Sequence, residues 1–86
     1  MKLRRTRAFE RSYASLPEQM QSKAEKAIRL LLQDFHHPSL HAKKMSGRKN
    51  IWEARVDYHY RFTFMLEGEV ITLRVIGNHD EVLKNP

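Results

Sequence analysis

The sequence predicts a small α+β domain in which two N-terminal helices pack on one face of a small antiparallel sheet. The sheet is expected to contain a short N-terminal strand and a three-strand C-terminal meander. Three observations predict this fold class: a helical apolar period in residues 17–35, a period of two in residues 52–75, and a length of only 86 residues. A chain of this length has room for one hydrophobic core, so we expect a single domain over residues 1–86.

The chain opens with two short elements. Residues 2–5 are compatible with a strand, and the side chain of Thr6 can cap the start of a helix. Phe9, Tyr13 and Leu16 follow at helical spacing, so we expect a short first helix.

A second, longer helix is predicted over residues 17–35. Ser15 and Glu18 have the spacing of a capping box, and Pro17 is tolerated in the first turn because its missing N–H would have no partner there. Pro38 is expected to end the helix. One face carries an apolar stripe, formed by Met20, Ala24, Ala27, Ile28, Leu31 and Phe35.

Residues 36–50 show neither period and are rich in His, Lys, Ser and Gly, which favours a basic connecting loop. His36, His37 and His41 lie in this region. Their spacing matches no compact ligand set and the chain has no cysteine, so we expect neither a metal site nor a cofactor.

Three strands are predicted after residue 50, because apolar and polar residues alternate there. Trp52 and Tyr60 start inward-facing runs, so we assign them to the core rather than to base stacking, which requires an exposed ring. The inward-facing residues are Trp52, Ala54 and Val56 in the first strand, Tyr60, Phe62, Phe64 and Leu66 in the second, and Ile71, Leu73 and Val75 in the third.

The polar face of this sheet is expected to gather arginines. If Glu67-Gly68 forms a two-residue hairpin turn, Arg61 lies directly opposite Arg74, and a tight turn at residues 57–59 places Arg55 beside Arg61. Like charges in such positions are unfavourable unless an anion or an acid lies between them. The arginines are therefore either a cradle for phosphate or part of a solvated face on which nearby acids pair with them.

A histidine stands at the end of the last strand. His79 is expected just beyond the sheet rim, near the same face. Imidazole gives or takes a proton near neutral pH without any shift of its pKa, so His79 is a candidate for acid–base chemistry if the arginines bind phosphate.

The overall charge agrees with an anionic partner. Lys and Arg number 16 against 10 Asp and Glu, a formal net charge of +6, which is typical of proteins that bind nucleic acid or an acidic protein. The sequence has no cysteine, no apolar segment typical of a signal peptide and no stretch long enough to span a membrane. We therefore expect a cytoplasmic protein that does not enter the membrane.

Several segments, taken in order, resemble the RelE/ParE superfamily of bacterial toxins over nearly the whole chain. They are Lys44-Met45-Ser46-Gly47 in the loop, Ile51-Trp52-Glu53-Ala54-Arg55-Val56, Tyr60-Arg61-Phe62-Thr63-Phe64, and the terminal Gly77-Asn78-His79-Asp80. The chain is most similar to the branch of RelE, YoeB and YafQ-type ribonucleases. Some members carry a tyrosine where this chain has Asp80.

The resemblance implies the toxin of a type II toxin-antitoxin system. Its activity would be that of a ribosome-dependent messenger RNA endoribonuclease, an mRNA interferase that inhibits translation without a metal, by attack of a 2′-hydroxyl. The implied partners are messenger RNA, the ribosome and a small cognate antitoxin. Two alternatives stay open: a ParE-like toxin that acts on DNA gyrase, and an inactive basic binding module of the same fold.

The resemblance also implies roles for individual residues. Arg61 would hold the scissile phosphate with help from Arg55, and His79 would be the general acid. The general base is His41, Glu53 or His59, of which His41 is slightly favoured. The expected RNA-binding residues are Lys43, Lys44, Arg48, Lys49 and Arg74, the last on the register argument alone.

Overall fold

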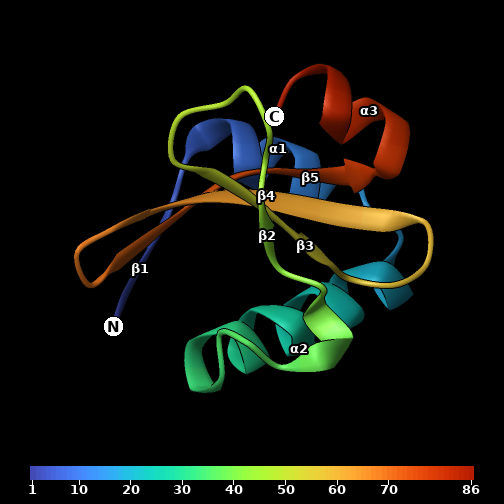
Figure 1. The fold of residues 1–86 in the computed structure, drawn as a ribbon. Helices are drawn as coiled ribbons and strands as arrows, with labels where there is room; N and C mark the ends of the chain where they lie inside the picture. Colours follow the sequence, from blue (N-terminus) through green and yellow to red (C-terminus); the bar gives the residue numbers. More distant parts are fainter.

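A five-stranded sheet with the order β1-β5-β4-β3-β2 runs through the centre of the molecule, and the computed structural model describes residues 1–86 (Figure 1). Helix α2 lies below the sheet in this view and α3 lies above it. The α+β fold class predicted from the sequence is confirmed. In chain order the elements are β1 Lys2–Arg5, α1 Arg7–Ala14, α2 Glu18–Gln33, the 3-10 turn η1 Pro38–Leu40, β2 Lys43–Lys44, β3 Ile51–Arg55, β4 Tyr60–Glu67, β5 Val70–Asn78 and α3 His79–Lys84.

The core lies between α2 and the face of the sheet that carries Phe62 and Phe64. The apolar stripe predicted for α2 is confirmed: Ala24, Ala27, Ile28 and Leu31 are buried, and Met20 and Phe35 pack against them. The ring of Phe35 stands edge-on to two rings of the sheet, with its centroid 5.1 Å from that of Trp52 and 5.7 Å from that of Phe64. These contacts join the segment that follows α2 to β3 and β4. No helix combines the length and the apolar composition needed to cross a membrane.

The start and the end of α2 differ from the prediction. Pro17 is the N-cap residue and no side chain caps the helix, so the capping box predicted for Ser15 and Glu18 is wrong. Ser15 is the C-cap of α1, and its hydroxyl donates to the carbonyl of Ser12 in that helix. The side chain is therefore already used when α2 begins. The helix ends at Gln33, with Asp34 as its C-cap, two residues before the predicted end.

The region predicted to be a basic connecting loop contains two short elements, η1 and β2. In β2, Lys43 pairs with Glu53 and Lys44 pairs with Trp52. The sheet therefore has five strands, and it is mixed, because β1 runs parallel to β5. A strand of two residues is too short to show a period of two in the sequence. It is recognised only by its pairing with the edge of β3.

The register of the β4–β5 hairpin corrects a prediction on which the arginine cradle was built. Glu67 pairs with Val70, so Gly68 and Glu69 form the loop, and Gly68 takes a φ of +59° as its first residue. Two-residue hairpin loops need such a backbone, which glycine adopts without strain.

A β-bulge shifts the register further. The ladder is irregular between Thr63 and Phe64, whose partners are Val75 and Leu73, so Arg74 is the unpaired extra residue. Arg61 therefore lies opposite Gly77, and its predicted position opposite Arg74 is wrong. Arg74 donates through Nε to the carbonyl of Pro86 at 3.0 Å and lies under the C-terminal segment.

The hydroxyl of Thr6 ties the start of α1 to this bulge. It accepts from the N–H of Phe9 at 3.1 Å, as the predicted cap should, and donates to the carbonyl of Arg74 at 2.9 Å. We predict that Thr6→Ala lowers the free energy of unfolding by about 1–2 kcal/mol, because it removes both hydrogen bonds. Thr6→Ser keeps the hydroxyl and should stay within about 0.5 kcal/mol of wild type. Equal urea-denaturation midpoints for the two variants would contradict this role.

Candidate functional site

Two arginines face each other where β3 ends and β4 begins. Arg55 and Arg61 are direct partners in the antiparallel ladder, and both alternate with the buried Ala54 and Phe62, so they lie on the sheet face opposite to the core. No carboxylate forms an ion pair with either arginine. The Nε of Arg55 is buried without a hydrogen-bond partner. A pair of unneutralised cations with an unsatisfied donor favours the binding of an anion between them.

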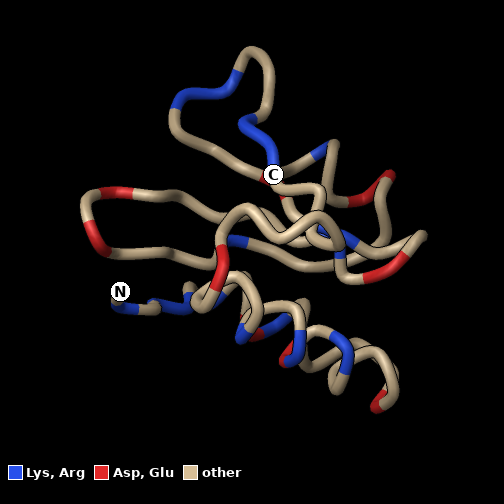
Figure 2. The backbone as a smooth tube through the Cα atoms, turned by 60° about the horizontal axis from the view of Figure 1, so that its bottom comes forward, with Lys and Arg blue, Asp and Glu red and all other residues tan.

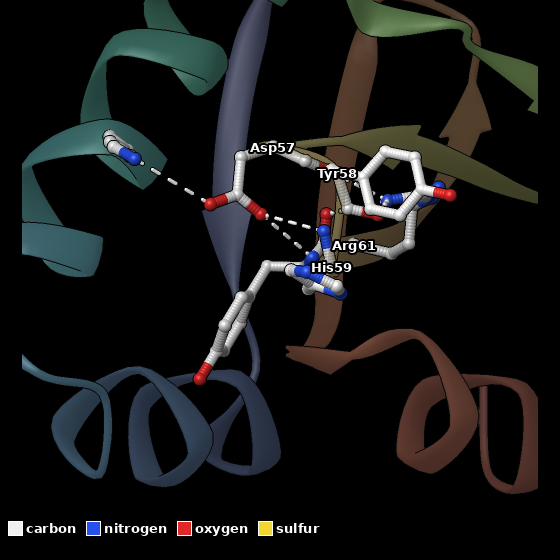
Figure 3. A network of polar contacts seen from close by, with 6 residues as sticks. Asp57, Tyr58, His59 and Arg61 are labelled. Atoms are coloured by element: carbon white, nitrogen blue, oxygen red, sulfur yellow. Dashed lines mark hydrogen bonds and ion pairs between the residues drawn. The ribbon is translucent and has the colours of Figure 1, made fainter.

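The turn between β3 and β4 is held by the carboxylate of Asp57 (Figure 3). Its Oδ1 accepts from the backbone N–H groups of His59 and Tyr60, each at 2.9 Å. Its Oδ2 lies 3.6 Å from the Nζ of Lys23 on α2. A single side chain therefore shapes the turn and connects it to the helix on the core side.

The charge of Asp57 is stabilised by these contacts. Partial burial pushes the pKa of Asp57 up, but the backbone N–H groups of Tyr60 and His59 and the ammonium of Lys23 outweigh it and hold the pKa below its ordinary value. The carboxylate stays ionised through the whole neutral range.

The same turn orients Arg61. Its Nη1 donates to the backbone carbonyls of Asp57 at 2.8 Å, Tyr58 at 3.1 Å and Tyr60 at 3.1 Å. Its Nε and Nη2 make no hydrogen bond within the protein. One side of the guanidinium is thus fixed by the turn, while the other side keeps donors for a ligand.

Helix α3 brings His79 to the same place. The backbone N–H of His79 donates to the carbonyl of His59 at 2.8 Å, and Asn78 caps the helix by accepting from the N–H of Glu81. The side chain of His79 is 46% exposed, and its Nδ1 lies 3.6 Å from Oδ1 of Asp80. The result is an open hollow of about 550 Å³, lined by Arg55, Tyr58, His59, Arg61, Asn78, His79 and Asp80. We call it the arginine hollow.

The arginine hollow thus brings together Arg55, Arg61 and His79 from the predicted site, along with one candidate base, His59. The other two candidate bases lie outside its lining. His41 follows η1 in a left-handed conformation with a φ of 46°. Glu53 is 7% exposed and its Oε1 lies 3.8 Å from the Nζ of Lys43.

The predicted RNA-binding residues divide into two groups. Lys43 and Lys44 lie on β2, and Arg48 and Lys49 lie in the loop after it, all exposed. This loop rises on the same side of the sheet as α3 (Figure 1), and positions occupied by Lys and Arg are coloured along the backbone there (Figure 2). Arg74 is separate from them, because its guanidinium contacts the carbonyl of Pro86 and, through Nη1, the Sδ of Met65 at 3.3 Å.

Sequence reasoning missed Tyr58. Its side chain lines the arginine hollow and is 76% exposed, and its ring stands edge-on to that of His59 with 4.9 Å between centroids. The available signal was its position in the polar turn between two strands, where neither period assigns a side chain to the core.

The family model of the ParE-like toxin domain matches residues 18–81 of the chain. The match covers most of the molecule, from the start of α2 into α3. The protein therefore belongs to the ParE-like toxin family, within the RelE/ParE superfamily to which its sequence motifs pointed. No curated protein sequence matches it.

Solved structures with the same fold share little sequence with this chain. The YoeB/ParE toxin from Agrobacterium tumefaciens superposes with a TM-score of 0.78 at 19% identity, covering 92% of this chain and 99% of its own. The DinJ-YafQ toxin-antitoxin complex of E. coli gives 0.79 at 12% identity, with 94% of both chains covered. The RelB-RelE antitoxin-toxin complex from Methanococcus jannaschii gives 0.75 at 17% identity, covering 96% of this chain and 99% of that one.

The lowered pKa of Asp57 predicts an acid-sensitive turn. A carboxyl whose pKa is lower in the folded than in the unfolded protein contributes stability above its unfolded pKa and loses it as the pH falls through the folded value. Asp57→Asn keeps an oxygen acceptor for the two N–H groups but has no charge to lose. We predict that wild type loses more stability than Asp57→Asn between pH 6 and pH 3, measured by urea denaturation. Parallel losses in the two proteins would show that the carboxylate charge is not important.

Proposed function

We propose that the protein is the toxin of a type II toxin-antitoxin system and that the arginine hollow cleaves messenger RNA. The observation that carries this proposal is the pairing of Arg55 with Arg61, without a neutralising acid, beside two imidazoles. Such a hollow offers what transesterification of RNA needs: cations for the phosphate and groups that accept and donate a proton. The structural likeness to YoeB, YafQ and RelE toxins supports the same function.

The proposed reaction needs no metal. The 2′-hydroxyl of one nucleotide attacks the adjacent phosphorus, the bond from phosphorus to the 5′-oxygen breaks, and a cyclic 2′,3′-phosphate and a free 5′-hydroxyl result. A base takes the proton from the 2′-hydroxyl, and an acid gives one to the leaving 5′-oxygen. The guanidinium groups of Arg55 and Arg61 stabilise the charge that builds up on the phosphate oxygens.

His79 is the proposed acid and His59 the proposed base. Both residues line the arginine hollow. The hydrogen bond from the backbone N–H of His79 to the backbone carbonyl of His59 keeps the two residues close together. This placement favours His59 over His41, to which the resemblance gave a slight preference.

The exposed basic segment would guide the RNA strand into the hollow. Lys43, Lys44, Arg48 and Lys49 supply positive charge on β2 and the loop that follows. Phosphate contacts of this kind give affinity without sequence information. We propose that the ribosome adds the positioning that a domain of this size lacks, so that messenger RNA is cleaved while it is being translated.

The pH dependence of cleavage tests the two imidazole roles. With purified ribosomes and a short messenger RNA, kcat should follow a bell-shaped curve. His79→Ala and His59→Ala should each lower kcat by about 10²- to 10⁴-fold, with loss of the alkaline limb in the first and of the acidic limb in the second. His41→Ala is the matched control and should stay close to wild type. Continued cleavage at a position that carries a 2′-deoxy nucleotide would exclude the mechanism.

A second function, inhibition of DNA gyrase, has one specific observation in its favour: the matching family model describes a ParE-like toxin domain. Expression in a bacterial host separates the two. A ribonuclease toxin should stop protein synthesis first, whereas a gyrase poison should induce the DNA damage response first. We expect early loss of methionine incorporation with wild type and none with Arg61→Lys, which keeps the charge but cannot form the same set of hydrogen bonds. Early DNA damage would favour the gyrase alternative.

We also propose a small cognate antitoxin as a partner. The solved structures of similar toxins include complexes with RelB and with DinJ. An acidic segment would fit the net charge of +6, and complementary charge speeds association. In the same expression experiment, growth should recover when the adjacent reading frame is expressed as well. Continued arrest would argue against a partner encoded there.

A further inference from the structure

We propose that Tyr58 is the stacking site for an unpaired base of the RNA strand whose phosphate lies in the arginine hollow. The inference rests on the proposed function and deepens it, since it names the contact that holds a base beside the scissile phosphate. The ligand is an unpaired nucleobase, and stacking on a tyrosine tolerates any of the four.

The exposure of Tyr58 is unusual for an aromatic residue of this chain. Its side chain is 76% exposed, whereas Phe9, Phe62 and Phe64 are fully buried and the remaining rings are partly buried against the core. A large ring that stays in water leaves apolar area available for a partner, and tyrosine couples such area with few rotatable bonds. Tyr58 takes no part in the core cluster, so its side chain makes no contribution there.

The ring of Tyr58 lies beside the position that a base of the bound RNA would take. Tyr58 is the only phenol or phenyl ring among the residues that line the arginine hollow. Its one aromatic neighbour, His59, meets it at an interplanar angle of 81°, and an edge-to-face contact uses at most one face of the tyrosine ring. At least one face therefore remains free for a base. Asp80, which follows His79 in the lining of the hollow, has no ring on which a base could stack.

The backbone links the ring directly to the phosphate-binding group. The carbonyl of Tyr58 accepts a hydrogen bond from Nη1 of Arg61 at 3.1 Å. The guanidinium that would hold the phosphate is thus bonded to the residue that would hold the base. A phosphate on Arg61 and a base on Tyr58 would accordingly belong to the same nucleotide or to its neighbour.

The turn that carries the ring is already ordered before any ligand arrives. Asp57, the residue before Tyr58, holds the two residues after it, because its Oδ1 accepts from the N–H groups of His59 and Tyr60 (Figure 3). Binding of a base therefore orders little more than the tyrosine side chain itself. Pre-organisation of this kind raises affinity because less conformational entropy is lost.

The test uses single-stranded RNA with a 2′-deoxy nucleotide at the cleaved position, so that binding is measured without reaction. Tyr58→Leu should weaken binding by about 5- to 100-fold, while Tyr58→Phe should stay within about twofold of wild type. The slope of log affinity against log salt should be the same in all three proteins, because the phosphate contacts remain. Leu32→Ala is the control and should bind like wild type, because Leu32 is an exposed apolar residue on α2, outside the arginine hollow.

A second comparison identifies the base itself. One nucleotide at a time is replaced by an abasic one. At one position, wild type should bind the abasic RNA more weakly than the intact RNA, whereas Tyr58→Leu should bind both equally. A 2-aminopurine at that position should be quenched by wild type and by Tyr58→Phe but not by Tyr58→Leu. Equal losses for wild type and Tyr58→Leu at every abasic position would overturn the stacking site.

The outcomes separate this inference from the proposed function. If wild type cleaves RNA and Tyr58→Leu binds and cleaves as well as wild type, stacking is excluded while the ribonuclease function stands. If wild type binds RNA with the quenching described but never cleaves it, the stacking site stands and the catalytic proposal fails. If Tyr58→Leu loses affinity only for a co-expressed protein partner, the ring is a protein contact and the stacking site is excluded. The melting temperature of Tyr58→Leu should match wild type, since the ring is outside the core.

Discussion

The hydrogen bonds accepted by the carboxylate of Asp57 are the interaction on which the candidate site depends. They close the turn between β3 and β4, and this turn supplies the carbonyls that hold Arg61 and the carbonyl of His59 that receives the N–H of His79. Without this turn, the side chains of the arginine hollow would not be held in fixed positions relative to one another. The contact with Lys23 connects the turn to α2, so the site is anchored to the largest helix of the fold.

The arrangement keeps an electrostatic cost in place. An acid paired with Arg55 or Arg61 would lower the repulsion between them, yet the acidic side chains around the site have other partners. Glu53 faces Lys43, Asp57 is bound to its own turn and to Lys23, and Asp80 lies beside His79. Unpaired like charges that persist in a small domain are typical of a site that gains its stabilisation only when a ligand binds. Helix α3 completes the site from the other side. The chain after α3 is fixed to the sheet, because the carbonyl of Pro86 accepts hydrogen bonds from the buried hydroxyl of Thr63 and from Nε of Arg74.

The low identity to proteins of the same fold, between 12 and 19% for the three described, shows how little of the sequence the architecture requires. The packing of α2 on β3, β4 and β5 needs apolar residues of suitable size at the right period, and many sequences meet that condition. Function depends instead on a few side chains at the rim, where β3, β4 and α3 meet. Family membership therefore establishes the fold of this chain, while its activity must be argued from the arginine hollow.

The sequence by itself determined the elements whose apolar period is long enough to read, which are the stripe of α2 and the three C-terminal strands. It also determined the Thr6 cap and the proximity of Arg55 to Arg61. The tertiary structure decided the rest. The loop conformation at Gly68 and the bulge at Arg74 set the β4–β5 register, β2 exists only as a partner of β3, and the Asp57 turn places Tyr58 and His59 in the arginine hollow. Periodicity is a local property that each segment carries alone. Register, edge pairing and the direction of turn side chains depend on hydrogen bonds between strands and within turns, so the apolar period of a single segment does not encode them.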